Sequence, residues 1–425
     1  MVLETAFSMD TSSIKYGAGV TREIGHEMKR LGSSRVMVVT DPNLADSDPV
    51  SITINSLNAE GIDTCLFDQV RVEPTDASFK EAIDTAVEGG FDGYVAIGGG
   101  SSMDTAKAAN LYATYPADFL LYVNKPIGQG IPVPGSLAPL IAVPTTTGTG
   151  SETTGVAIFD LVEMKAKTGI AHHALRPAMG LVDPDNTRTL PSIVAACSGL
   201  DVLCHGLEAF TAIPYNQREA PAHPGLRPAY QGSNPVSDVW AIRAVEMVVK
   251  NIVRAVLDPA DHEARGQMLL AATFAGVGFG NAGCHLPHGM SYPVSGMVKR
   301  FKPKGYPVGH DIVPHGMSVA LNAPAVFRFT SAASPGRHRM AAQLMGADMS
   351  DAGDEDVGEL LAEAIIKLLR EIDMPNGLGA IGYEPKDVDA LVEGTIPQHR
   401  VTKLSPLPAG RAELRRLFLE SMVLW

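Results

Sequence analysis

The sequence has few cysteines and lacks segments of the kind that enter membranes. Its four cysteines form no CxxC pair and no spacing typical of a disulfide framework. No stretch approaches about 18 apolar residues free of charge, the length that a spanning helix needs. The first residues, MVLETAFSMDTSS, contain neither the apolar core of a signal peptide nor an Arg-rich presequence. From these absences we expect a reduced, cytoplasmic protein with no membrane partner.

Basic residues are also in deficit, with 34 Lys and Arg against 47 Asp and Glu and a formal net charge of −13. A surface of this sign repels nucleic acids and anionic lipids, so neither is expected as a partner. A small anionic substrate is not excluded, because a few local basic residues can reverse the field within one site.

The hydrophobic pattern of the 425 residues changes near residue 189. Before this point, short runs rich in β-branched residues alternate with helical stretches, which predicts crossover units and a mostly parallel sheet. We therefore expect residues 1–189 to form an α/β domain with a Rossmann-like sheet. The predicted strands are 36–39, 64–67, 94–97, 140–143 and 156–159, and 21–31 is a predicted helix.

After residue 190 the strand patterns nearly disappear, so we expect residues 190–425 to form an all-helical domain. The Pro- and Gly-rich stretch 216–235 is predicted to be a long ordered loop. Ligand sites often lie between two such domains. The predicted helices are 192–210, 237–256, 264–277 and 357–372.

A glycine-rich turn follows the predicted strand 94–97 and leads into a helical stretch. Consecutive glycines let backbone N–H groups approach a pyrophosphate closely, and the start of the helix adds positive potential. The pattern favours phosphate binding over a plain turn. The residues concerned are Gly98, Gly99, Gly100, Ser101 and Asp104.

Two more polar positions follow predicted strands. The loop PTTTGTGSE (144–152) presents hydroxyl groups of Thr145, Thr146 and Thr149, which either bind the base or nicotinamide or cap a turn. Asp41 follows the first predicted strand, where an acid can bind ribose hydroxyls and would repel a 2′-phosphate, which favours NAD over NADP. An Asp at this position is also common as a turn or N-cap residue.

Four residues suggest a metal site. Asp201 and His205 are four residues apart in a predicted helix, a spacing that stacks both side chains on one face. His288 and His315 each occur in a Pro-His-Gly-Met sequence, which predicts two similar turns that present imidazoles. A lone buried histidine is more often a core residue than a ligand, but the pair and the repeated turn together favour a metal. One carboxylate and three imidazoles suit Fe²⁺ or Zn²⁺.

These motifs together resemble the iron-containing alcohol dehydrogenase family over essentially the whole chain. The resemblance is carried by the GGGS turn, the PTTTGTGSE loop, the Asp201–His205 pair and both PHGM turns. It implies a dinucleotide-binding domain, a helical metal domain and a cleft between them. It also implies NAD and Fe²⁺ as cofactors and a homo-oligomer.

The resemblance further implies roles for individual residues. Asp41 would contact the adenosine ribose, and Gly98 to Ser101 would contact the pyrophosphate. Thr145, Thr146 and Thr149 would contact the base or the nicotinamide side. Lys167 matches a family lysine near the nicotinamide ribose.

Further segments resemble one branch of the family, which moves hydride between hydroxy acids and oxo acids. The resemblance implies 4-hydroxybutyrate as donor and 2-oxoglutarate as acceptor. If NAD stays bound between the two half-reactions, the net result is transhydrogenation with no free NADH. The alternatives are an NAD-dependent alcohol or 4-hydroxybutyrate dehydrogenase that releases NADH, and a lyase like dehydroquinate synthase. The segments are VRVEPTD (70–76), GTGSETTGVAIFD (148–160), RPAYQGSNPVSD (227–238), GFGNAG (278–283) and HGMSYPVSG (288–296).

The chain departs from the family at the proton relay. Many members carry a histidine four residues after the third metal ligand, whereas this chain has Tyr292. The proton path therefore stays open among Tyr292, His285 and bulk water, and His285 is also a lower-ranked candidate ligand. Carboxylate substrates need a cation, for which Arg227 in the long loop is one candidate. The other candidates form a basic run that equally suits a solvated face: Lys299, Arg300, Lys302 and Lys304.

Overall fold

The computed structural model describes residues 2–164 and 166–425, and the chain divides into two compact units. One unit is the segment Asp10–Leu190, and the other combines Pro191–Trp425 with Met1–Met9. The prediction that the domain 1–189 includes the first residues was therefore wrong for those residues. The reason is hydrogen bonding: the Glu4 N–H donates to the Arg218 carbonyl over 2.9 Å, which ties the start of the chain to the long loop of the helical unit.

Six parallel strands form the sheet of the unit Asp10–Leu190, in the order β1-β8-β5-β4-β2-β3. Parallel neighbours need crossover connections, and helices supply them here. The predicted α/β class with a parallel sheet is confirmed. The strands are β1 (Ser13–Tyr16), β2 (Arg35–Val39), β3 (Asp63–Phe67), β4 (Gly93–Gly98), β5 (Leu140–Pro144) and β8 (Met179–Val182).

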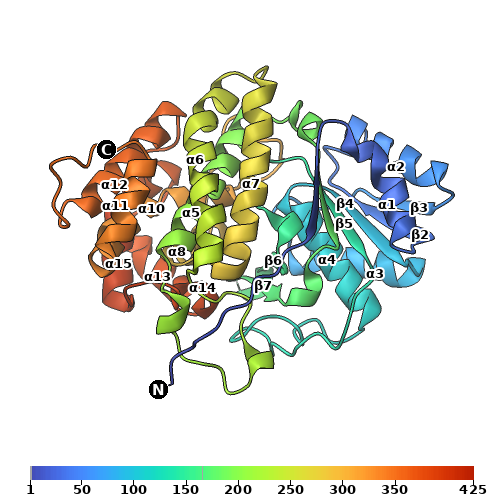
Figure 1. Ribbon diagram of the computed structural model, residues 1–425, viewed down its shortest axis with the longest axis horizontal. Coiled ribbons are helices and arrows are strands. Elements are labelled where there is room, and N and C mark those ends of the chain that lie inside the picture. Colours follow the sequence, from blue (N-terminus) through green and yellow to red (C-terminus); the bar gives the residue numbers. More distant parts are fainter. Residues whose placement is uncertain (1, 165) are drawn as a thin grey trace. The chain divides into compact units, whose positions relative to one another are not determined.

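Helices cover both faces of this sheet, and Figure 1 shows α1 and α2 on one side and α3 and α4 on the other. Val38 of β2 packs in the cluster that contains Ile24 of α1, whereas its neighbour Met37 packs in the cluster that contains Met103 of α4. A strand buried on both faces has a continuous apolar sequence, which made 36–39 predictable. The helices are α1 (Ile24–Arg30), α2 (Asp48–Ala59), α3 (Asp76–Gly89) and α4 (Gly100–Thr114).

Three strands were not predicted: β1, β8 and β7 (Ala166–Ala171). β1 has the sequence SIKY and is largely exposed, so it lacks an apolar run. The predicted strand 156–159 is present as β6 (Val156–Leu161), but it pairs antiparallel with β7 in a separate two-stranded sheet. The 3-10 helices of this unit are η1 (Val20–Glu23), η2 (Ser151–Thr153), η3 (Val162–Met164), η4 (His173–Leu175) and η5 (Pro184–Thr187).

Helices supply nearly all the regular structure of the other unit, which confirms the predicted helical class. The longer ones are α5 (Ser192–Thr211), α6 (Pro235–Leu257), α7 (His262–Ala282), α8 (Leu286–Gly296), α11 (Pro335–Leu344) and α12 (Val357–Glu371). The shorter ones are α9 (His315–Ala320), α10 (Ala323–Thr330), α13 (Val388–Thr395), α14 (His399–Thr402) and α15 (Arg411–Glu420). The 3-10 helices are η6 (Tyr215–Gln217), η7 (Pro224–Leu226), η8 (Ser331–Ala333), η9 (Leu378–Ile381) and η10 (Pro385–Asp387).

α5 forms the core of the helical unit and packs against α6, α7 and α9. Among the described residues, α5 is the one continuous helix that is long and apolar enough to cross a membrane. Most of it is buried inside the unit. It also carries Asp201, His205 and Glu208 on its buried surface. Its composition is therefore that of a core helix.

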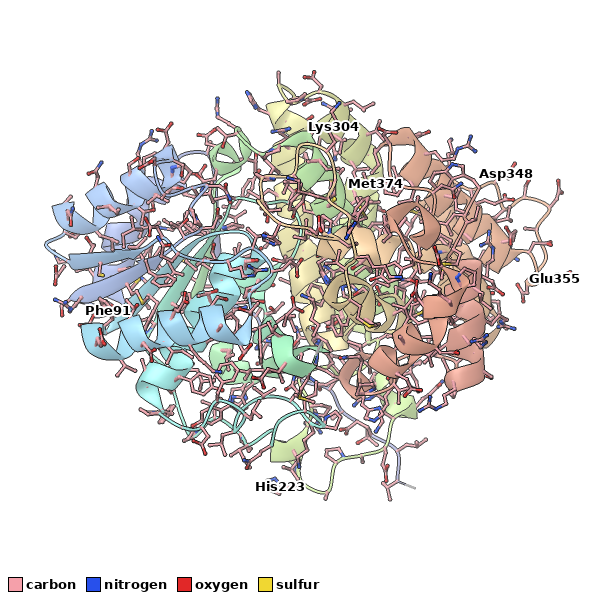
Figure 2. The ribbon with its side chains drawn as sticks, turned by 180° about the vertical axis from the view of Figure 1, so that it is seen from behind. Phe91, His223, Lys304, Asp348, Glu355 and Met374 are labelled. Atoms are coloured by element: carbon pink, nitrogen blue, oxygen red, sulfur yellow. The ribbon has the colours of Figure 1, made fainter. Side chains whose placement is uncertain are left out.

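Two long loops lie on the surface of the helical unit. The first follows α5, includes η6 and η7, and carries His223, which Figure 2 labels. The predicted loop 216–235 is thus present, and α6 begins at its last residue. The second loop joins α8 to α9 and carries the exposed Lys304 (Figure 2).

Candidate functional site

The buried face of α5 carries three ionisable side chains, Asp201, His205 and Glu208. Their spacing of four and then three residues places them on one side of the helix. All three are almost completely buried, with exposed fractions of 2%, 4% and 0%. Burying charged groups is costly without partners, so their convergence needs an explanation beyond packing.

The two Pro-His-Gly-Met sequences form matching turns at the starts of α8 and α9. In each turn a serine three residues after the histidine donates a hydrogen bond to the histidine carbonyl. The distances are 2.8 Å from Ser291 Oγ to His288 O and 2.7 Å from Ser318 Oγ to His315 O. The repeat in the sequence therefore produces the same local structure twice.

Gly316 allows α9 to approach α5 closely. A Cβ built on Gly316 would lie 2.0 Å from the Cys197 carbonyl oxygen and 2.8 Å from Asp201 Cβ. No residue with a side chain fits this position without moving the backbone. The glycine of the second turn thus lets His315 reach the carboxylate on α5.

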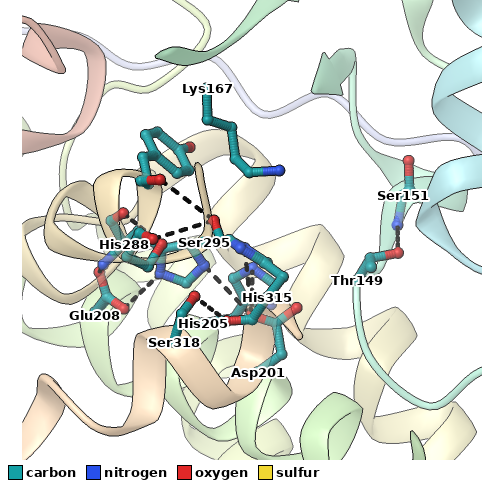
Figure 3. Close-up of polar contacts among 12 residues, drawn as sticks. Thr149, Ser151, Lys167, Asp201, His205, Glu208, His288, Ser295, His315 and Ser318 are labelled. Atoms are coloured by element: carbon teal, nitrogen blue, oxygen red, sulfur yellow. Dashed lines mark hydrogen bonds and ion pairs between the residues drawn. The ribbon is translucent and has the colours of Figure 1, made fainter. Parts of the chain in front are cut away.

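The imidazoles of His205, His288 and His315 surround one oxygen of Asp201 (Figure 3). Their Nε2 atoms lie 3.8, 3.5 and 3.8 Å from Asp201 Oδ1, in that order. These distances are long for hydrogen bonds. Ligand atoms about 2.1 Å from a shared tetrahedral ion are about 3.4 Å apart, which is close to the observed separations. We call these four residues the metal cluster.

Three atoms of the metal cluster are buried with no hydrogen-bond partner within the described part of the chain: Asp201 Oδ1, His205 Nδ1 and His288 Nε2. Unsatisfied buried polar atoms are rare, and an ion is a common reason for them. One oxygen and three nitrogen donors suit Fe²⁺ or Zn²⁺, so the residues fit a divalent cation. Burial raises the pKa of the nearby Cys284 thiol to about 11.

Glu208 fixes the orientation of His288, a role that was not predicted from the sequence. Its Oε1 lies 2.6 Å from His288 Nδ1, and its Oε2 accepts from the backbone N–H of His285 over 2.7 Å. Burial alone would raise the pKa of Glu208, but the charge and hydrogen bond of His288 hold it below the ordinary value. A carboxylate on Nδ1 keeps the proton there and leaves Nε2 free as a donor to a metal. The spacing of 201, 205 and 208 was the available signal.

The predicted proton-relay residues have different surroundings. Tyr292 lies one turn after His288 on α8, and its ring centroid is 6.3 Å from that of His315. His285 points to another partner: its Nε2 lies 3.0 Å from Thr211 Oγ1, and burial lowers its pKa to about 4. The structure therefore brings Tyr292, and not His285, beside the metal cluster.

The predicted cationic residues are already paired or exposed. Arg227 Nε lies 3.0 Å from Glu4 Oε2, and Lys299 forms an ion pair with Asp387. The other members of the basic run, Arg300, Lys302 and Lys304, are exposed or lie at the surface of the loop between α8 and α9. None of these cations is brought to the metal cluster.

In the other unit, the predicted nucleotide loops follow three adjacent strands, β2, β4 and β5. A Cβ on Gly99 would lie 3.2 Å from Thr146 Oγ1, and a Cβ on Gly100 would lie 2.6 Å from Thr149 Cγ2. We call residues 98–100 the glycine turn and residues 144–152 the threonine loop. These two segments are therefore in direct contact. We call the ends of these three strands the nucleotide edge.

Backbone geometry at the nucleotide edge fits a pyrophosphate. Gly98 has φ +148°, and a Cβ there would lie 2.3 Å from Ser102 Oγ. α4 begins at Gly100, and no side chain caps its first N–H groups. Two hydroxyls, Thr40 Oγ1 and Ser102 Oγ, are buried with no hydrogen-bond partner among the described residues. Uncapped helix N–H groups behind glycines are suited to an anion, so the residues fit a dinucleotide.

The remaining predicted cofactor residues are held by protein partners. Asp41 Oδ1 accepts from the Asn43 N–H over 2.9 Å, which is the alternative turn role. Asp104 Oδ1 accepts from Ser151 Oγ over 2.8 Å and Oδ2 from the Ile158 N–H over 2.9 Å. These bonds attach α4 to the threonine loop and to β6.

Ser101 and Lys167 both contact Glu73. Ser101 Oγ accepts from the Glu73 N–H over 3.2 Å. Lys167 Nζ lies 2.6 Å from Glu73 Oε2 and 3.2 Å from Asp160 Oδ1. Burial opposes the charge of Lys167, but the two carboxylates hold its pKa above the ordinary value.

Comparison with known proteins agrees with this geometry. Residues 11–184 match the family model "Iron-containing alcohol dehydrogenase", and residues 229–422 match "Fe-containing alcohol dehydrogenase family, C-terminal". The chain is 55% identical over 422 residues to "Hydroxyacid-oxoacid transhydrogenase, mitochondrial" of Pongo abelii, covering 99% of this chain and 90% of the relative. It is 54% identical to the protein of the same name from Homo sapiens, with the same coverage.

Solved structures share the fold. A 1,3-propanediol oxidoreductase is 25% identical with a TM-score of 0.85, covering 98% of this chain and 100% of the other. A sulfoacetaldehyde reductase from Bifidobacterium kashiwanohense, determined in complex with NAD⁺, is 24% identical with a TM-score of 0.80 and covers 99% of both chains.

The expectation of a cytoplasmic protein was wrong, because the curated relatives are named mitochondrial. The prediction relied partly on unpaired cysteines. These indicate a reducing environment, which does not distinguish the cytosol from other reducing compartments.

Proposed function

Because the chain belongs to the iron-containing alcohol dehydrogenase family, we propose that it is a hydroxyacid–oxoacid transhydrogenase. In one half-reaction 4-hydroxybutyrate would be oxidised to succinic semialdehyde, and in the other 2-oxoglutarate would be reduced to 2-hydroxyglutarate, so that hydride and proton balance over the two. NAD held at the nucleotide edge would supply the hydride acceptor and donor. The observation that carries the proposal is the convergence of three imidazoles on Asp201 Oδ1. The substrate class, a hydroxy acid and an oxo acid, follows the name shared by the relatives. The particular pair is the one that the sequence resemblance implies.

The proposed metal ligands are Asp201, His205, His288 and His315, with Fe²⁺ as the ion. When bound, the ion supplies Lewis-acid polarisation of the substrate oxygen, and NAD supplies the hydride acceptor and donor. Glu208 holds a proton on His288 Nδ1, so that Nε2 keeps its lone pair. Asp201, His205 and His288 are buried, and this exclusion of water strengthens their electrostatic effect.

The proposed NAD contacts are at the nucleotide edge, where the glycines leave room for a pyrophosphate beside the start of α4. Lys167 remains our candidate near the nicotinamide ribose. The complete proposed set is Asp41, Gly98, Gly99, Gly100, Ser101, Asp104, Thr145, Thr146, Thr149 and Lys167.

For the proton we propose Tyr292 Oη, because its ring lies beside that of His315 whereas His285 is bound to Thr211. Tyr292→Phe removes the hydroxyl and leaves the ring packing. It should lower kcat about 100-fold with little change in metal content. An unchanged kcat would assign the proton to water.

The test of the proposed function follows one deuterium atom. Iron-loaded protein is incubated with 4-hydroxybutyrate deuterated at the carbinol carbon, 2-oxoglutarate and an excess of free unlabelled NADH. A transhydrogenase that retains its cofactor delivers deuterium to C2 of 2-hydroxyglutarate without dilution. If the label is diluted into free NADH, and NADH accumulates with added NAD⁺ and 4-hydroxybutyrate alone, the protein is instead a dehydrogenase that releases NADH.

Light scattering on the same sample tests the proposed homo-oligomer.

A further inference from the structure

Arg400 contacts two aromatic side chains of the helical unit. It lies on α14, is partly buried, and its Nη2 donates to Tyr292 Oη over 2.5 Å. Its guanidinium carbon lies 4.9 Å from the centre of the Tyr230 ring. A cation over the face of one phenol and bonded to a second is held in a fixed position.

Both aromatic neighbours of Arg400 lie close to the metal cluster, Tyr292 directly and Tyr230 through Phe279. The Tyr292 ring lies 6.3 Å from that of His315, nearly parallel to it at 22°. The Tyr230 ring lies 6.4 Å from that of Phe279, which stacks on His205 at 3.8 Å. α14 also packs against α8, the helix that presents His288. Arg400 is therefore separated from the candidate ligand His315 by a single aromatic layer.

Arg400 has no acidic partner in the described part of the chain, whereas other arginines of this unit do. Arg227 pairs with Glu4, and Arg337 pairs with Asp238. A guanidinium has five N–H donors in a planar fork that matches a carboxylate, and here its contacts are with two phenols, Tyr292 and Tyr230. A partly buried arginine whose charge no carboxylate balances is suited to an anion that arrives from solution.

We propose that Arg400 binds the carboxylate of both substrates, an inference that rests on the proposed function. The two substrates share one spacing: in each, two methylene groups separate the reacting carbon from a carboxylate. That carboxylate is C1 in 4-hydroxybutyrate and C5 in 2-oxoglutarate. One fixed cation at a constant distance from the metal cluster therefore serves both half-reactions. Arg400 thus selects short acids with two intervening methylenes.

The kinetic test compares Arg400→Met with Arg227→Met, a matched loss of charge at an arginine that is paired elsewhere. With metal-loaded enzyme, Arg400→Met should raise KM for 4-hydroxybutyrate and for 2-oxoglutarate about 100-fold. Its KM for butan-1-ol, which has no carboxylate, should change by less than about threefold. If the loss of Arg400 acted only by disturbing Tyr292, to which it donates a hydrogen bond, kcat would fall for all substrates, including butan-1-ol. Arg227→Met should leave all KM values near those of the wild type.

A chain-length series sharpens the assignment. The wild type should prefer 4-hydroxybutyrate to 3-hydroxypropanoate and 5-hydroxypentanoate, and Arg400→Met should lose this preference. Arg400→Lys keeps the charge without the fork and should restore part of the affinity, with KM about tenfold above the wild type. Butan-1-ol turnover and metal content report whether each variant is folded. Equal losses for butan-1-ol and 4-hydroxybutyrate in both variants would overturn the proposal.

Binding without turnover separates this inference from the proposed function. Calorimetry with glutarate, an unreactive dicarboxylate, is carried out on the metal-loaded holoenzyme. Binding to the wild type that weakens about 100-fold in Arg400→Met supports the carboxylate site, even if the deuterium experiment shows a dehydrogenase. Glutarate binding that is equal in the wild type, Arg400→Met and Arg400→Lys would reject Arg400, even if transhydrogenation is found.

Discussion

The two candidate sites are built in opposite ways. The metal cluster consists of side chains from α5, α8 and α9 that meet at one carboxylate oxygen. The nucleotide edge consists of backbone, where the absence of Cβ atoms at Gly98 and Gly100 leaves space at the ends of adjacent strands. The metal cluster depends on the ligand atoms that its side chains provide. The nucleotide edge depends on glycines, whose lack of a Cβ leaves room for a phosphate. Substitutions can therefore damage one site and leave the other intact.

The largest effect is expected from Asp201→Asn, which keeps the shape but removes the charge that three imidazoles share. Metal content should fall close to zero, and turnover should fall about 1000-fold or more, because Lewis-acid catalysis provides several kcal/mol. NAD binding should persist. Elemental analysis and NAD titration measure the two properties, and Asp348→Asn on the loop shown in Figure 2 is the control. Full metal retention would contradict the assigned ligands.

The reverse experiment is Gly98→Ala. The added Cβ meets Ser102 Oγ at 2.3 Å, and φ is +148°, so NAD affinity should fall about 10- to 100-fold with normal metal content. Gly90→Ala is the control, because Gly90 has φ +60° but nothing within 4 Å of an added Cβ and lies at the end of α3. It should lower thermal stability without changing NAD affinity. Equal NAD affinity in Gly98→Ala and the wild type would remove the glycine turn from the nucleotide site.

A smaller effect is expected from Glu208→Gln, which keeps a hydrogen-bond partner for His288 but removes its charge. Metal affinity should fall about 10- to 100-fold, measured in buffers of fixed free metal concentration. NAD affinity should not change. Glu246→Gln, at an exposed ion pair of α6, should retain normal metal affinity. If both variants bind metal alike, Glu208 has only a packing role.

The smallest effect concerns Glu4, which belongs to neither site. The hydrogen bond from Arg227 and that from the Ala6 N–H lower the pKa of Glu4 to about 2 from 4.5. A depressed carboxyl pKa stabilises the fold fully above about pH 4.5, and the contribution is lost as pH falls toward about 2. The Tm difference between the wild type and Glu4→Gln should be at most about 2 °C at pH 7 and should shrink in that window. A difference independent of pH would argue against the ion pair.

The sequence predicted features with local causes. Buried strands such as 36–39 are continuous apolar runs, and the Asp201–His205 pair and the PHGM turns follow from short spacings. β1 was missed because its sequence SIKY is mostly exposed. Glu208 could be recognised from its spacing to Asp201 but was overlooked.

Features with distant causes were not predictable. The Arg400–Tyr292 contact joins residues 108 positions apart, and the Arg227–Glu4 pair joins residues 223 apart. No periodicity reports such contacts, because they depend on how helices and loops pack. This is why sequence proximity favoured Arg227 for the substrate, whereas the structure favours Arg400.

The division of the chain has a consequence for synthesis. The α/β unit is one uninterrupted segment, Asp10–Leu190. All the residues that pack within it have therefore been synthesised before most of the helical unit is made. In the helical unit, by contrast, Glu4 is synthesised long before its partners Arg218 and Arg227. Its hydrogen bonds with them can form only after both arginines have been added to the chain. The last candidate ligand of this unit, His315, is translated later still. All four candidate ligands are therefore present only after His315 has been synthesised, when the segment that carries the nucleotide edge is already complete.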